Sequence, residues 1–249
     1  MAAKPLVDLY PPVRQLKSLF YGVTDGVLAA PTPCPGWSVG DLLDHLTVLT
    51  VVFTQAARKV TDGPGAAAPP PDPSSVRLHP RWRGRLPAML DDLATAWADP
   101  LAWTGTAQTG GVTMPADRIG ILAVQELTLH GWDLAKATGQ DFAADPRTLL
   151  VLATFLATAQ DGSAGAQGGP TAGQGGSTAG QGGPTLGGPA LDGGPALDGP
   201  APSRNRPPAT RDGPPGGTAV PLTVDVEDEA ALLEQVVGLS GRDPRWRPS

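Results

Sequence analysis

Cysteine is nearly absent from this 249-residue chain. The one cysteine, Cys34, has no second thiol to pair with, so a disulfide framework within the chain is excluded. Basic charge is also scarce, since 18 Lys and Arg face 24 Asp and Glu and the net charge is −6. Binding to nucleic acid depends on clustered positive charge, so this balance argues against a nucleic-acid partner.

Long apolar stretches are missing too. No run of the sequence reaches the roughly 18 consecutive apolar residues that a membrane-spanning helix needs. The first residues, MAAKPLVDLYPP, lack the apolar segment of a secretory signal. We therefore expect a cytoplasmic protein with no membrane partner.

Several catalytic motifs are absent as well. The glycine-rich part of the sequence has no lysine placed as in a phosphate-binding P-loop. The chain contains neither a G-x-S-x-G nucleophile elbow nor the H-E-x-x-H order of zinc peptidases. These absences remove support for NTP-binding, α/β-hydrolase and peptidase functions.

Glycine and proline, by contrast, are abundant, with 33 and 29 residues. They concentrate in residues 162–217, which contain near-repeats such as PTAGQGG and PALDG and almost no large apolar side chains. Such a segment cannot bury enough apolar surface to offset the entropy cost of ordering. We predict a helical domain at 1–161, a disordered linker at 162–217 and a short C-terminal segment at 218–249 that docks on the helical domain.

Outside the linker, the apolar residues repeat with the spacing of amphipathic helices. Ser38 with Asp41 is typical of a helix N-terminus, and Gly139 is typical of a helix end. A turn or short hairpin is expected at 108–112. The fold class predicted from these patterns is all-α, an up-and-down helical bundle. The expected helices are 8–23, 38–60, 84–98, 114–138 and 147–160, with a short C-terminal helix near 232–239.

One helix carries an acid and a histidine where apolar residues are expected. Glu126 and His130 are four residues apart and so lie on one helix face. Ile119, Leu122 and Ala123 share that face, which predicts that the pair points into the bundle. A buried carboxylate without a basic neighbour is costly unless a cation pairs with it.

His45 presents the same anomaly on an earlier helix, among Leu42, Leu46 and Leu49. If the two helices are neighbours, His45 meets Glu126 and His130 across the interior. Two imidazoles and one carboxylate can bind a divalent ion and leave a position open, as catalytic sites do. We therefore predict a metal site formed by His45, Glu126 and His130.

Plainer interpretations stay open at this stage. A histidine near an apolar face can be a hydrogen-bonded core residue, and a Glu–His pair four residues apart can be solvated. Asp133 is either an outer partner of His130 or an ordinary acid. Cys34 is a packed side chain or, alternatively, a reactive thiol. His79 is expected to be exposed, and three tryptophans are expected to pack rather than to form a ligand cage, namely Trp37, Trp103 and Trp132.

Three stretches resemble a known family. Residues 32–46 (TPCPGWSVGDLLDHL) and 126–135 (ELTLHGWDLA) are similar to two signatures of the mycothiol-dependent maleylpyruvate isomerase-like proteins. That family belongs to the DinB-like four-helix-bundle superfamily. The ending Gly241–Pro244 (GRDP) is similar to the C-terminus of its actinobacterial metal-binding subgroup.

The resemblance implies a DinB-like four-helix bundle and a divalent ion, most often zinc, at His45, Glu126 and His130. Nickel, iron and manganese suit the same ligands. It also implies that the ion activates the thiol of mycothiol toward a small electrophile. The isomerase has a sizeable second domain that the linker and tail of this chain do not match, so maleylpyruvate isomerisation itself is not carried over.

The sequence thus favours a metal-dependent, thiol-using transferase or isomerase acting on small electrophiles. The alternative is a non-catalytic protein that binds a metal ion or a partner. A third interpretation is a helical bundle in which the interior Glu and His only hydrogen-bond to each other and bind no metal ion. The oligomeric state stays open.

Overall fold

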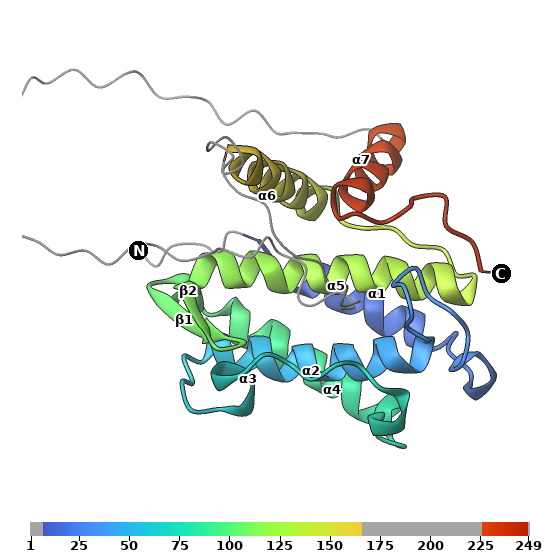
Figure 1. Cartoon of the computed structure of the whole chain (residues 1–249), viewed down its shortest axis with the longest axis horizontal. Helices are drawn as coiled ribbons and strands as arrows, with labels where there is room; N and C mark the ends of the chain where they lie inside the picture. The colour runs from blue at the N-terminus through green and yellow to red at the C-terminus, as the bar shows by residue number, and fades with distance from the viewer. Residues whose placement is uncertain (1–6, 166–225, 249) are drawn as a thin grey trace, which may run out of the picture.

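The computed structural model describes residues 7–165 and 226–248 (Figure 1). The helix-rich class expected from the sequence is confirmed. The elements, in chain order, are α1 (Tyr10–Phe20), η1 (Asp25–Val27), α2 (Val39–Ala57), α3 (Pro64–Ala67), η2 (Ser75–Arg77), α4 (Trp82–Ala98), η3 (Pro100–Trp103), β1 (Thr106–Thr109), β2 (Val112–Pro115), α5 (Ala116–Thr138), α6 (Pro146–Gly165) and α7 (Val226–Leu239).

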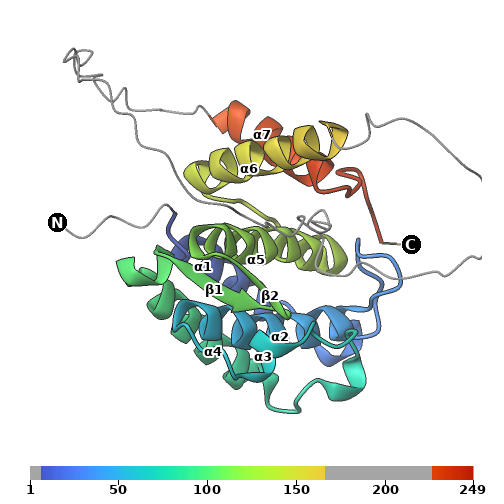
Figure 2. The same ribbon diagram turned by 60° about the vertical axis from the view of Figure 1, so that its left-hand side comes forward.

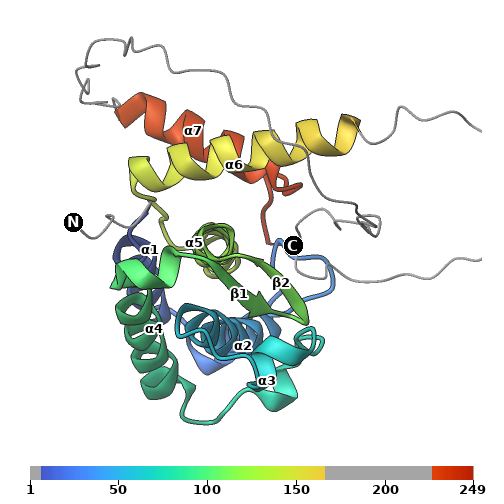
Figure 3. The same ribbon diagram turned by 90° about the vertical axis from the view of Figure 1, so that its left-hand side faces the viewer.

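The helices α1, α2, α4 and α5 surround one apolar core, and Figure 3 shows α5 almost end-on with the others beside and below it. Helix α2 packs against α4 and α5, and α1 packs against the same two helices. Their facing side chains exclude water, which is the main stabilising contribution to such a core. Fully buried members include Leu16, Leu46, Leu90, Leu93 and Ile119.

Local sequence signals set the ends of the helices that carry the candidate site. The Ser38 hydroxyl accepts from the Asp41 backbone N–H, and the Asp41 carboxylate accepts from the Ser38 N–H, so the predicted cap is confirmed. Gly139, at φ 68°, ends α5 in the left-handed conformation that glycine tolerates best. Helix α2 ends at Ala57, slightly earlier than expected, because the backbone turns at Lys59 with φ 56°.

The predicted hairpin is confirmed, since β1 and β2 pair antiparallel with Thr109 opposite Val112. Gly110 and Gly111 between them have φ values of 59° and 83°, which suits a tight two-residue turn. The turn is tied to α3, since the Gly110 N–H donates to the Gly65 carbonyl. The connection between α2 and α4 contains two short helical turns, α3 and η2.

Helices α6 and α7 form a second layer over the outer side of α5 (Figures 1 and 2). They pack mainly against each other, and Val236 and Val237 of α7 are fully buried. Helix α6 runs to Gly165, a few residues beyond the predicted start of the linker, and the rest of the predicted linker lies outside the described residues. Within the described part of the chain, no helix combines the length and hydropathy needed to cross a membrane.

Candidate metal centre

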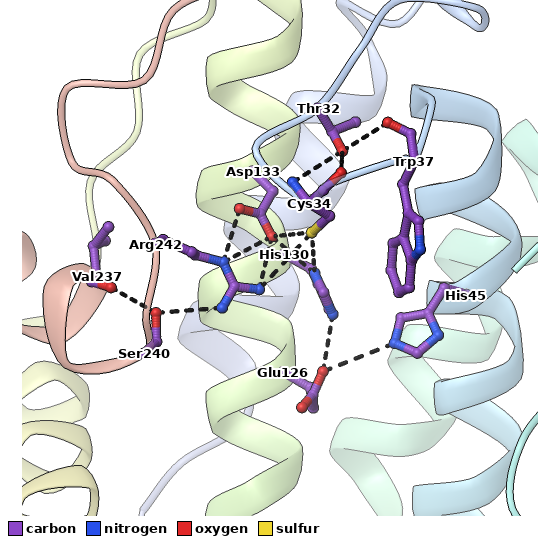
Figure 4. Close-up of polar contacts among 10 residues, drawn as sticks. All are labelled: Thr32, Cys34, Trp37, His45, Glu126, His130, Asp133, Val237, Ser240 and Arg242. Carbon is purple, nitrogen blue, oxygen red and sulfur yellow. Dashed lines mark hydrogen bonds and ion pairs between the residues drawn. The ribbon is translucent and has the colours of Figure 1, made fainter. Parts of the chain in front are cut away.

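The three predicted ligands meet between α2 and α5. His45 projects from α2, and Glu126 and His130 project from the facing side of α5, one helical turn apart (Figure 4). All three side chains are buried, with residue exposures of 6%, 8% and 4% in chain order. Neighbouring leucines on both helices anchor this face in the core, so the polar atoms are held inside an apolar frame.

The donor atoms of these residues converge on one point. His130 Nε2 lies 2.9 Å from Glu126 Oε2, and His45 Nε2 lies 3.9 Å from the same oxygen. The two imidazole rings are edge to face, with centroids 5.0 Å apart. One ligand atom from each residue falls within 4.8 Å of the others, a spacing that suits binding to a single ion.

The electrostatics of this cluster depend on the competition between burial and neighbouring charge. Burial alone would raise the pKa of Glu126, but hydrogen bonding and charge from His130 and His45 outweigh it, so the pKa is lowered. Burial is the main reason that the pKa of His45 is lowered, which favours the neutral imidazole that ligates metals. In the described residues, no Lys or Arg forms an ion pair with Glu126, so its direct partners are the two imidazoles.

The opposite edge of the His130 ring has a different environment. His130 Nδ1 donates to Asp133 Oδ2 at 2.9 Å, and the Cys34 thiol donates to the same oxygen at 3.1 Å. Arg242, from the segment after α7, donates to both Asp133 oxygens through Nε and Nη2. Burial alone would lower the pKa of His130, but its hydrogen bonds to Asp133, Cys34 and Glu126 raise it.

Cys34, His130 and Asp133 form a second group whose donor atoms are also within 4.8 Å of one another. The Arg242 guanidinium already balances the Asp133 carboxylate and lies 4.0 Å from the Cys34 sulfur. A cation added there would be repelled by the arginine, which stays charged at any ordinary pH. The group formed by His45, Glu126 and His130 is therefore the better candidate for a metal ion.

A proline-rich loop carries Cys34 and Trp37 to the site. The loop is closed by a β-bridge between Pro31 and Ser38, and the Thr32 hydroxyl accepts from the Cys34 N–H. The half-buried Trp37 ring lies 4.8 Å from the His45 ring and 5.9 Å from the His130 ring, centroid to centroid. This tryptophan therefore forms one wall of the site, which the sequence pattern alone did not indicate.

The other residues singled out in the sequence lie apart from this cluster. His79 is exposed, as expected, and its Nδ1 accepts from the Arg81 N–H. Trp103 packs against Trp97, and Trp132 is buried with Lys136 over its ring.

Arg242 was missed as a site residue. The signal that could have found it is Asp133, which lies one turn from His130 and also needs a cation if the helix is buried.

The fold and the site together define a helical domain with a buried donor set of two histidines and one glutamate. Residues 12–135 match the profile of the family described as the mycothiol maleylpyruvate isomerase N-terminal domain. The helical domain of this chain belongs to that family, as its signatures at 32–46 and 126–135 had indicated. Curated protein sequences give no significant match.

Two solved structures are similar to this chain. One is described as the mycothiol-dependent maleylpyruvate isomerase, with 17% sequence identity and a TM-score of 0.40. The other is a histidine-to-alanine mutant under the same description, with 15% identity and a TM-score of 0.40. In both cases the match covers 58% of this chain and 65% of the solved chain.

Proposed function

We propose that His45, Glu126 and His130 bind one divalent metal ion, and that the protein is a mycothiol-dependent transferase or isomerase acting on small electrophiles. The family membership of residues 12–135 supports the thiol chemistry. The proposed fold is the DinB-like four-helix arrangement of α1, α2, α4 and α5, and a cytoplasmic location remains a prediction. The division into domains at 1–161, 162–217 and 218–249 also remains a prediction.

One observation carries the metal proposal. Glu126 is buried, and its ion-pair partners among the described residues are two imidazoles. A buried carboxylate is stable only with a compensating cation. Of the two imidazoles, burial keeps His45 neutral, so only a protonated His130 could supply that charge in the metal-free protein. A divalent ion satisfies the carboxylate and uses both Nε2 lone pairs.

The donor set fits such an ion on chemical grounds. Two imidazole nitrogens and one carboxylate oxygen are typical zinc ligands, and three protein ligands leave a position for another group. Nickel, iron and manganese accept the same donors, so the ligands favour zinc without excluding these ions. When bound, the ion would supply Lewis acidity that lowers the pKa of a nearby thiol.

The residues of the chain have distinct roles in this proposal. Glu126 contributes the negative charge of the site, and His45 contributes an imidazole that burial keeps neutral. His130 is oriented through its Nδ1 by Asp133, so that Nε2 faces Glu126. Trp37 shields both imidazoles from bulk water and offers an apolar surface to an incoming thiol or electrophile.

The alternative is a non-catalytic metal-binding or partner-binding protein. The low exposure of all three ligands favours it, because a substrate must reach the ion. An enzyme of this kind has to open a path beside Trp37, whereas a storage or structural site does not.

The decisive experiment measures metal content per chain by mass spectrometry after purification with zinc. We expect about one ion per wild-type chain and none in His130→Ala. His79→Ala is the matched control, because His79 is exposed and lies outside the site. Equal metal content in wild type and His130→Ala would contradict the proposed ligands.

The zinc-loaded protein then separates the enzyme from the binding protein. The protein is assayed with a panel of small electrophiles, and consumption of one of them should require the metal and mycothiol together. Stoichiometric zinc without thiol-dependent turnover would favour the non-catalytic alternative.

A further inference from the structure

Arg242 belongs to the C-terminal segment, yet its guanidinium is inserted beside α5. It follows Asp133 by 109 residues in the sequence. Its Nε lies 2.9 Å from Asp133 Oδ1, and its Nη2 lies 2.9 Å from Oδ2 (Figure 4). A planar guanidinium that donates to both oxygens of a carboxylate fixes their orientation as well as their charge.

Both carboxylate oxygens of Asp133 accept hydrogen bonds. Its side chain has no exposed surface. The oxygen Oδ2 accepts from His130, Cys34 and Arg242, whereas Oδ1 accepts from Arg242 alone among the hydrogen bonds of the described residues. Without Arg242, Oδ1 is a buried charged oxygen with no donor, and the carboxylate must turn or draw in water.

The orientation of Asp133 determines the orientation of the His130 ring. The two nitrogens of an imidazole lie on opposite edges, so fixing Nδ1 against Asp133 directs Nε2 toward Glu126, 2.9 Å away. Partners that hold the outer nitrogen of a ligating histidine set its tautomer and its direction.

The arm that carries Arg242 is itself anchored. Val236 and Val237 of α7 are fully buried, and the Arg242 Nη1 lies 3.3 Å from the Ser240 hydroxyl. The backbone that carries the guanidinium is therefore anchored through α7, since the Arg242 N–H also donates to the Val237 carbonyl.

We propose that Arg242 is a positioning residue for the metal centre, acting through Asp133 on His130. The proposal rests on the proposed metal site. By linkage, the docked C-terminal segment favours metal binding, and the bound metal favours docking to the same extent.

The test compares four full-length proteins: wild type, Arg242→Ala, Arg242→Lys and Arg245→Ala. Arg245 is exposed and only three residues away, so Arg245→Ala is the matched control. Each protein is titrated with Zn²⁺ against a chelating dye and with Co²⁺ while its visible spectrum is recorded. We expect Arg242→Ala to bind zinc about 10–100-fold more weakly, the effect typical of losing an outer partner.

The cobalt spectrum at saturation separates positioning from a general loss of stability. A misplaced His130 changes the ligand field and shifts the spectrum of Arg242→Ala. A purely structural role leaves the spectrum at saturation unchanged and only lowers the amount of folded protein. Arg242→Lys keeps the charge but not the double hydrogen bond, so its zinc affinity is expected between wild type and Arg242→Ala.

A second measurement needs no metal. The His130 Nδ1 proton is followed by NMR in the metal-free proteins. It should exchange with solvent at least about tenfold faster in Arg242→Ala than in Arg245→Ala, the change expected from weakening a charge-assisted hydrogen bond. If wild type takes up neither Zn²⁺ nor Co²⁺, the proposed function fails, and this exchange rate alone decides whether Arg242 positions His130.

Two results overturn the proposal. The first is an Arg242→Ala protein with the zinc affinity, cobalt spectrum and proton exchange of Arg245→Ala. The second result matters if Arg242→Ala does not fold. The proposal is then tested on Arg242→Lys instead. Wild-type affinity, spectrum and exchange in Arg242→Lys would show that the double hydrogen bond to Asp133 does not position His130.

Discussion

Each of the two nitrogens of the His130 ring faces a buried carboxylate, and the charges of these two carboxylates are paired in different ways. On the Nδ1 side, Asp133 is paired with Arg242, a fixed positive charge from the chain itself. On the Nε2 side, Glu126 has His45 and His130 and forms no ion pair with an arginine or lysine of the described residues. Both carboxylates are buried on the same helix, less than two turns apart.

This difference indicates which side accepts an external cation. A carboxylate already paired with a guanidinium gains little from a metal ion, because the arginine would have to be displaced. A carboxylate faced by imidazoles gains much more, since imidazoles can give up protons and become ligands. The same distinction predicts that matched substitutions on the two sides have different consequences.

The largest effect is expected from Asp133→Asn. This change leaves the half-buried Arg242 without its counter-charge, which is expected to lower the free energy of unfolding by about 3–5 kcal/mol even without metal. Urea denaturation of the metal-free protein measures it. Asp91→Asn is the control, because Asp91 forms an exposed ion pair with Lys17 that is worth about 0–1 kcal/mol. Equal losses of unfolding free energy in Asp133→Asn and Asp91→Asn would show that the pairing of Asp133 with Arg242 contributes no more than an exposed ion pair.

Glu126→Gln should act on metal binding more than on the fold. His130 can release its extra proton when the carboxylate charge is removed, so the metal-free protein should lose less stability than Asp133→Asn does. Zinc affinity should fall more than about 100-fold, beyond the effect of losing an outer partner. Chelator competition measures the affinity, and exposed Glu234→Gln serves as the control. Undiminished zinc binding in Glu126→Gln would place the ion elsewhere.

A smaller, graded effect is expected from pH. The pKa of His130 is raised, so its proton stabilises the metal-free fold below about pH 6.5, and this contribution is lost as pH rises through the folded-state pKa. Zinc must replace the proton on Nε2, so its affinity should rise about tenfold per pH unit while His130 is protonated. Titrations at several pH values from about 5.5 to 8 measure this slope. A flat profile would mean that zinc does not compete with this proton.

The sequence was sufficient where neighbouring residues determine the outcome. Glu126 and His130 share a face because of their spacing on one helix, and Ser38 with Asp41 starts a helix through hydrogen bonds between residues three apart. Bringing His45 to the same point required the additional assumption that the second and fourth predicted helices are neighbours. The packing of α2 against α5 is consistent with that assumption.

The sequence was insufficient where the partner is remote. Nothing in the local pattern of Asp133 indicates whether its cation is a lysine one turn away, a metal ion or an arginine 109 residues later. The position of Trp37 against both imidazoles depends on the closed loop between Pro31 and Ser38, whose path is set by tertiary contacts. Such pairings are decided by the packing of whole elements, which helical periodicity does not encode.

The separation of Asp133 from Arg242 also has a consequence in time. Ribosomes add about 5–20 residues per second, so 109 residues take roughly 5–20 s to synthesise. Throughout that interval the newly made α5 contains a carboxylate whose arginine does not yet exist. Until Arg242 is made, Asp133 lacks its guanidinium partner, and a metal ion acquired then would meet a His130 that the C-terminal segment has not yet fixed.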